Sequence, residues 1–241
     1  MDSDLYEAAI TGNLDVLNGN QQKVRDQLTP DNNTALHLAS TFGQTKAVKA
    51  ILHLHSQSLL VRANAQGGTA LHLAARGGHT CTVRELIEYG KKLDQEEDIE
   101  SQPKAWQFYL WMVNEEGDTA LHEAVRYHHT QVAVMLIEQD TIYSHSSNKS
   151  GETPLYLAAS RGFVDLVGVI IDKCRSPAGP AYGGPYSTTA LHGAVICKHS
   201  KNSEGTVKNS LLYIYIYIHF RTNKILDMKL IDNKLHRFIT K

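Results

Sequence analysis

The sequence predicts an all-α solenoid, built from helix-turn-helix repeats with short hairpin turns and followed by an irregular C-terminal tail. The main observation is a short word, Thr-Ala-Leu-His-Leu-Ala at 69–74, that returns at a near-constant spacing. Its counterparts occupy residues 34–39, 119–124, 153–158 and 189–194. The leucines of these copies stand 35, 50, 34 and 36 residues apart. Self-similarity at such a period is the signature of a repeat architecture.

Each copy also predicts its own helices. The threonine suits an N-cap, because its hydroxyl can accept a backbone N–H of the first turn. Gly78 stands where the first helix must end, and glycine adopts the left-handed conformation there at little cost. A second apolar stripe at helical spacing then follows in Val83, Leu86 and Ile87. Each unit is therefore predicted as turn, helix, turn, helix.

The repeat starts near residues 34, 69, 119, 153 and 189 divide the chain into three parts. Residues 1–33 are predicted to form an N-terminal capping repeat, because they match the helical pattern but lack the threonine start. Residues 34–200 contain the repeats, interrupted by an insertion at 93–113. Residues 201–241 leave the pattern, and their eight Lys+Arg against three Asp+Glu give a balance of 8 − 3 = +5. They form a divergent basic tail.

The insertion combines an acidic stretch at 94–100 with an aromatic stretch at 106–112. We expect the acidic part to be a solvated loop. The aromatic part is too apolar for a loop, and two interpretations remain open. It forms either helical turns packed on the stack or an exposed patch that binds a partner.

Three hairpin positions and one helix end stand out from the pattern. Asn64, Asn114 and Asn148 each precede a repeat leucine by seven residues, and asparagine supports turns through hydrogen bonds to the backbone. His128 stands where the turn glycine is expected, at a cost on the order of 1 kcal/mol for a left-handed conformation. A Pro/Gly-rich loop at 176–186 replaces the last hairpin.

Composition restricts the class of protein. The chain has 24 Lys+Arg and 25 Asp+Glu, and this near-neutral balance argues against a nucleic-acid partner. The sparse cysteines Cys81, Cys174 and Cys197 suggest a reducing compartment. No signal peptide is recognisable at the start, and no apolar run approaches the ~20 residues of a membrane span. We expect a cytoplasmic chain that is soluble or peripheral to a membrane.

The period and the Thr-Pro-Leu-His-x-Ala pattern resemble the ankyrin repeat over roughly residues 1–200. This resemblance implies that the motif histidines are structural and hydrogen-bond between neighbouring turns. The implied structural motif residues are Thr34, His37, Thr69, His72, Thr119, His122, Thr153, Thr189 and His192. The other histidines lack a cysteine or carboxylate set at zinc spacing, so no metal and no cofactor is predicted. No catalytic motif is present either, and we expect no enzyme.

The same architecture implies a concave face formed by the hairpin tips and the exposed sides of the first helices. Arginine and aromatic side chains dominate interface energetics, so this face is the candidate site for a protein partner. The candidate residues are Phe42, Gln66, Arg76, Glu115, Glu116, Arg126, Tyr127, Lys149 and Arg161.

Four short segments make the resemblance more specific. They lie at residues 5–9, 117–129, 150–162 and 181–185. Together they are similar to the plant ankyrin-repeat membrane proteins of the accelerated-cell-death type. That family joins a cytosolic array to several membrane spans and is linked to defence signalling and the control of cell death. This chain departs from it, because the later repeats and the membrane block are missing. Residues 201–241 come from a truncated gene or from read-through of non-coding sequence, and both alternatives stay open.

Two functions from different classes follow from this resemblance. The first is a non-enzymatic protein–protein interaction module in plant defence or cell-death signalling. The second is a membrane-associated regulator that acts with full-length, membrane-spanning relatives. In this chain we expect membrane contact to be only weak or indirect, through the basic tail.

Overall fold

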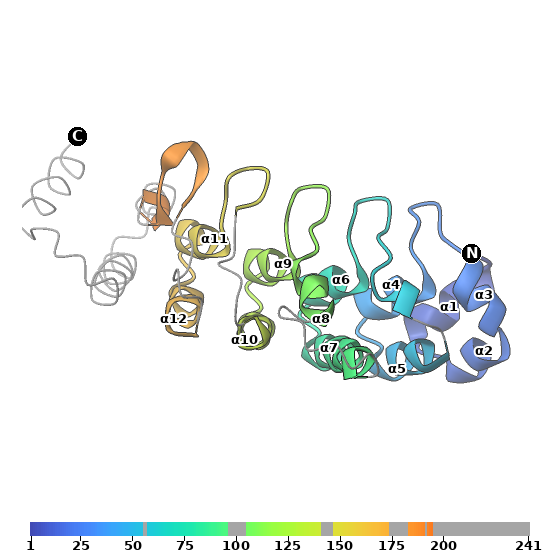
Figure 1. Cartoon of the computed structure of the whole chain (residues 1–241). Coiled ribbons are helices and arrows are strands. Elements are labelled where there is room, and N and C mark those ends of the chain that lie inside the picture. The colour runs from blue at the N-terminus through green and yellow to red at the C-terminus, as the bar shows by residue number, and fades with distance from the viewer. Residues whose placement is uncertain (55–56, 96–104, 141–146, 174–182, 191, 195–241) are drawn as a thin grey trace, which may run out of the picture.

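The computed structural model describes residues 1–54, 57–95, 105–140, 147–173, 183–190 and 192–194. In these ranges it consists of helices and turns, without a strand, and one isolated β-bridge joins Gly183 to Thr189. The helices stack in one elongated row (Figure 1). The predicted all-α solenoid is therefore confirmed. The tail at 201–241, the cysteines Cys174 and Cys197, and most of the loop at 176–186 lie outside the described residues.

The row is built from helix pairs, each made of a first and a second helix. The pairs are α1 (Ser3–Thr11) with α2 (Leu14–Gly19), α4 (Ala35–Thr41) with α5 (Thr45–Leu54), α6 (Ala70–Arg76) with α7 (Thr80–Gln95), α9 (Ala120–Arg126) with α10 (Thr130–Gln139), and α11 (Pro154–Arg161) with α12 (Val164–Lys173). Two further helices, α3 (Gln21–Asp26) and α8 (Ala105–Trp111), lie outside this pairing. Short 3-10 turns occur at Gln57–Leu59 and Pro185–Ser187.

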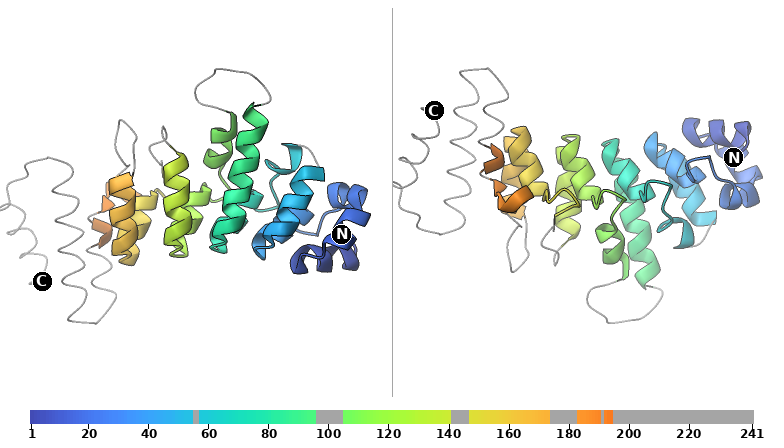
Figure 2. Two further views of the ribbon diagram at one scale, coloured as in Figure 1. Left: turned by 90° about the horizontal axis from the view of Figure 1, so that it is seen from below. Right: turned by 90° about the horizontal axis from the view of Figure 1, so that it is seen from above.

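Three layers run along the row (Figures 1 and 2). The first helices pack on one another in the order α1, α4, α6, α9 and α11, and the second helices pack in the order α2, α5, α7, α10 and α12. The hairpins between successive pairs project beyond the first helices, on the side away from the second helices (Figure 1). The hairpins and first helices thus form a continuous face.

The core lies between the two helix layers and repeats with the sequence pattern. The repeated leucines are buried, namely Leu36, Leu71, Leu121 and Leu155. The second helices also bury one apolar residue at a matching position, namely Ile51, Leu86, Leu136 and Ile170. The alanines next to the repeated leucines are also buried, and their small side chains let neighbouring helices approach closely. Since each unit buries its apolar residues against its neighbours, the array depends on contacts between adjacent repeats.

The predicted helix ends are present. The side-chain oxygens of Thr34, Thr119 and Thr153 accept backbone N–H groups of the first turn. Gly78, two residues after the last residue of α6, has a φ of +70°. His128 takes the same left-handed conformation with a φ of +60°, as its position in the pattern predicts.

The inserted residues lengthen one helix and add another. α7 continues to Gln95, beyond residue 93 where the insertion is predicted to begin. The acidic stretch lies mostly in the undescribed range 96–104. The aromatic stretch forms α8, which packs against α7 with Tyr109 and Leu110 buried. Helical packing therefore accounts for these residues, although Phe108 of the same helix stays 55% exposed.

Candidate functional site: the hairpins and the first helices

The hairpin tips are joined to one another through their backbones. Ala65 N–H donates to Asp31 O, Glu115 N–H to Gln66 O, and Lys149 N–H to Glu116 O, each at 2.9 Å. These hydrogen bonds hold adjacent hairpin tips in a constant position relative to one another. The linkage also explains the glycines at the tips. A Cβ on Gly67, whose φ is +73°, would lie 2.8 Å from the backbone nitrogen of Glu115.

The predicted asparagines hold the inside of the hairpins. The Oδ1 atom of Asn64 accepts N–H groups of Gln66 and Gly68, at 3.0 and 2.9 Å. Asn114 repeats this pattern with Glu116 and Asp118. The role that the sequence assigned to these side chains is therefore confirmed.

The motif histidines join each first helix to the following hairpin. Nε2 of His37 lies 3.0 Å from Gly68 O, that of His72 lies 3.0 Å from Asp118 O, and that of His122 lies 3.2 Å from Glu152 O. In each repeat Nδ1 accepts the N–H of the preceding threonine at 3.2 Å. One ring nitrogen thus accepts while the other donates, and only the neutral imidazole can do both.

Burial favours the neutral form of the His37 and His72 rings. It lowers the pKa of His37 to about 4, against the opposing effect of the hydrogen bond to the Gly68 carbonyl. Burial also lowers the pKa of His72. His192 contacts Thr189 in the same manner but is exposed, and the residues that follow 194 are not described.

The fourth repeat has Tyr156 in place of the motif histidine. Its N-cap, Thr153, uses its free hydroxyl to donate to Gly183 O at 2.8 Å. The junction to the next hairpin is therefore preserved by a different side chain.

The candidate partner residues fall into two groups. Seven of them are exposed: Phe42, Gln66, Glu115, Glu116, Tyr127, Lys149 and Arg161. Phe42 and Tyr127 are the large apolar members, with 49% and 51% of their surfaces accessible. Arg76 and Arg126 form the second group, because their guanidinium groups are already engaged inside the stack.

Arg76 binds a buried carboxylate of the next repeat. Its Nε and Nη2 atoms lie 3.0 and 2.6 Å from the two oxygens of Glu123, which is 2% exposed. Asn114 also donates to Glu123, at 3.1 Å. Hydrogen bonds from charged and neutral donors together stabilise this buried charge.

Arg126 is engaged in the same way by Asp118. Its Nη2 atom lies 2.6 Å from Asp118 Oδ2, and its Nη1 atom lies 3.7 Å from Glu152 Oε2. Asn148 of the next hairpin donates to Asp118 Oδ1 at 2.6 Å. A charged network therefore crosses from the second repeat to the fourth beneath the candidate face. Because both guanidinium groups already contact these carboxylates, only their remaining N–H groups are accessible to a partner.

Sequence reasoning missed the two acids of this network. The signal for Glu123 was present, since Leu38, Leu73 and Leu157 occupy the equivalent position in the first, second and fourth repeats. A charge replacing a leucine on a core-facing pattern requires a nearby cation when it is buried. Arg76 supplies it, but the two are 47 residues apart in sequence.

These features define the class of protein: a helical repeat array whose stacked hairpins and helices offer a continuous surface. A family model described as "Ankyrin repeats (3 copies)" matches residues 5–97, 57–145 and 104–178, which together cover more than half of the chain. The chain belongs to the ankyrin repeat family, whose repeats indicate a protein–protein interaction module and are generally not catalytic. No curated protein matches it.

Two further observations concern the described residues alone. They contain no group of three or more histidine, cysteine, aspartate or glutamate residues placed to hold a metal ion. None of their helices has both the length and the apolar character that crossing a membrane requires.

Proposed function

We propose that this chain is a non-enzymatic binding module that presents the face formed by its hairpins and first helices to a protein partner. The exposed pair Phe42 and Tyr127 carries the proposal. Aromatic side chains contribute large contact areas at interfaces, and an exposed one gains most from being covered. Both residues end first helices of a stack whose neighbours are joined by hydrogen bonds. A partner would therefore meet a surface that is already ordered, which reduces the entropic cost of binding.

The resemblance of the words at 5–9, 117–129, 150–162 and 181–185 to plant accelerated-cell-death-type proteins supports a place in defence or cell-death signalling. In that setting the chain would act in the cytoplasm. The same resemblance supports a second candidate function, in which the chain regulates membrane-spanning relatives by binding their arrays. Both functions use the same face.

The double variant Phe42→Ala/Tyr127→Ala tests the face. We expect it to retain at most about one tenth of the partner that the wild-type chain captures from plant leaf extract, since interface aromatics rank among the largest contributors to binding. The matched control is Glu88→Ala, on the exposed side of α7. Thermal unfolding of each variant establishes that the stack is intact.

Undiminished capture by the double variant, or an equal loss in the control, would rule this face out. The identity of the captured protein separates the two candidate functions. A membrane-spanning ankyrin protein favours the regulator, and a soluble signalling protein favours the free module.

A further inference from the structure

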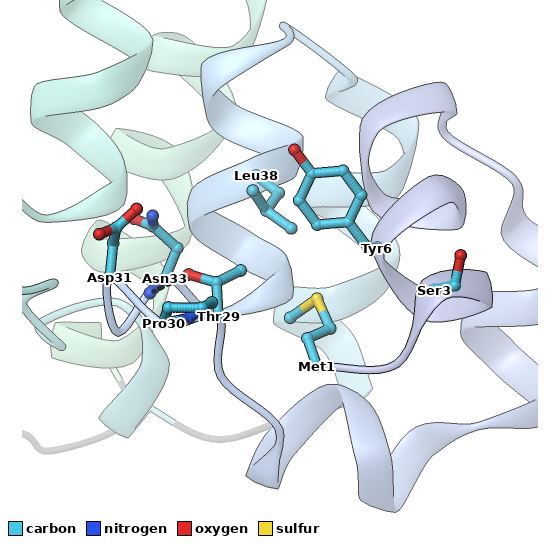
Figure 3. Close-up of a pocket in the computed structure, with 8 residues that line it drawn as sticks. All are labelled: Met1, Ser3, Tyr6, Thr29, Pro30, Asp31, Asn33 and Leu38. Carbon is cyan, nitrogen blue, oxygen red and sulfur yellow. Dashed lines mark hydrogen bonds between the residues drawn. The ribbon is translucent and has the colours of Figure 1, made fainter.

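A groove opens at the N-terminal end of the row, between the first hairpin and the helices α1 and α4 (Figure 3). Its volume is about 510 Å³, which lies in the range of small-molecule and side-chain pockets. The lining residues are Met1, Ser3, Tyr6, Thr29, Pro30, Asp31, Asn33 and Leu38.

The groove has an apolar interior. Leu38 is 7% exposed and belongs to the core, while Met1 is partly buried against that core. The ring of Tyr6 extends from α1 toward Leu38 and is 41% exposed (Figure 3). The groove therefore offers aliphatic contacts beside one accessible aromatic ring.

One acidic side chain, Asp31, lines the groove. Asp31 is exposed at the hairpin tip and forms no ion pair with any residue in the described ranges. Glu7 is also exposed and lies one helical turn after Ser3 on α1, so it borders the same side. Cations also lie at this end of the row. Lys23 is paired with Asp2 at 3.1 Å, whereas the Met1 ammonium group donates to Leu28 O, a neutral acceptor that leaves its charge in place.

The hairpin holds Asp31 in place. Thr29 N–H donates to Asn33 O at 3.0 Å, and Asn33 N–H donates to the Thr29 hydroxyl at 3.0 Å. The carbonyl of Asp31 itself accepts Ala65 N–H of the next tip. These hydrogen bonds fix the hairpin backbone on both sides of Asp31.

We propose that this groove is an anchoring site for a lysine or arginine side chain carried by an extended segment of a partner protein. The aliphatic stem would lie along Leu38 and Met1, as long cationic side chains cover apolar surface while their charge stays in water. The charged head would face the Tyr6 ring, as a cation–π contact, and the Asp31 carboxylate. The inference rests on the proposed binding function and adds the chemistry of the partner.

The experiment uses the full chain and two labelled synthetic peptides, one extended and arginine-rich, the other identical except for glutamate at every arginine. We expect only the arginine peptide to bind, and Asp31→Lys to weaken it on the order of tenfold at low salt. High salt should weaken binding to the wild type and remove most of the difference. Tyr6→Ala should also weaken binding, whereas Tyr6→Phe, which keeps the ring, should not.

The matched control is Glu88→Lys, which makes the same charge change on the exposed side of α7. Equal binding of both peptides, no binding of the arginine peptide, or equal losses in Asp31→Lys and Glu88→Lys would each overturn the groove. Capture that depends on Phe42 and Tyr127 but not on Asp31 would overturn the groove and leave the proposed function standing.

Discussion

The third and fourth repeats build nearly the same backbone from different side chains. The third has the motif histidine His122, a buried acid at 123 and a left-handed histidine at 128. The fourth has Tyr156, Leu157 and Gly162 at these positions. Both repeats nevertheless begin at a threonine N-cap and turn through a left-handed residue, with φ of +60° and +75°.

Each departure is matched by a residue of an adjacent repeat or hairpin. His128 replaces glycine, and the ring of Phe163 in the next repeat stacks on it at 3.9 Å and an interplanar angle of 2°. Where the glycine is kept, as at Gly78, a histidine of the next repeat covers it instead. Tyr156 replaces histidine, and Gly184 provides the space for its ring. The two repeats therefore differ in their side chains, but the contacts between neighbouring repeats are maintained in both.

The largest effect that we expect is a pH-dependent loss of stability in the repeats that contain the motif histidine, but not in the fourth repeat, which contains Tyr156 instead. The pKa of His37 is 6.5 in the reference state and about 4 when folded. Between these values the unfolded chain binds more protons, so the free energy of unfolding falls as pH falls from 6.5 toward 4 and is unaffected by this ring above that window. The loss is about 3 kcal/mol for His37 alone, and His72 acts in the same direction.

Urea unfolding from pH 7 to pH 4 measures this loss. Hydrogen exchange should show that α4 and α6 lose protection before α11, where Tyr156 stands in place of the motif histidine. A free energy of unfolding that stays constant down to pH 4 would contradict the histidine assignment.

The buried acid of the third repeat gives the next effect. Arg76→Ala should destabilise the array by about 3 kcal/mol, because it leaves the charge of Glu123 buried with only Asn114 as a donor. Adding Glu123→Leu, which installs the residue of the first, second and fourth repeats, should recover most of the loss. Chemical denaturation of the single and double variants tests this, and equal stability of the two would show that the loss does not come from the buried charge of Glu123.

The tyrosine of the fourth repeat predicts a steric effect. Gly184 has a φ of −145°, which any residue can adopt, but a Cβ there would lie 2.2 Å from Tyr156 Cδ2. Gly184→Asn, which installs the asparagine found at 64, 114 and 148, should therefore cost about 2 kcal/mol. Tyr156→His in the same chain should rescue it. A shift in melting temperature that is the same with and without Tyr156→His would argue against this compensation.

The smallest effect concerns the left-handed histidine. His128→Gly relieves a conformational cost of about 1 kcal/mol and loses a ring stack worth about the same, together with an exposed contact to Asp165. We expect the free energy of unfolding to change by less than about 1 kcal/mol. A larger loss in denaturant titrations would mean that the stack with Phe163 dominates the junction.

The pattern of single residues predicted the fold well because its signals are local. The threonine, the leucine and the left-handed turn residue act within one or two helical turns, so the helix starts and the strain at His128 followed from spacing. The asparagines also acted as expected, because their hydrogen bonds close within four residues. The exposed or packed state of the 106–112 stretch remained open, since it depends on the neighbouring α7.

The candidate site was less predictable for the same reason. Arg76 and Arg126 carry the residue type favoured at interfaces, yet both meet buried carboxylates, one of them contributed by the next repeat. The groove at Tyr6 and Asp31 also brings together residues from α1, the first hairpin and α4.

The repeat class, the helix order and the residues of each turn are predictable from the sequence, because periodicity and capping chemistry act within short segments. The charges shared between repeats and the side chains that face solvent become known only from the folded array. Those properties depend on distances between segments 30 to 50 residues apart, and stacking alone brings such segments together.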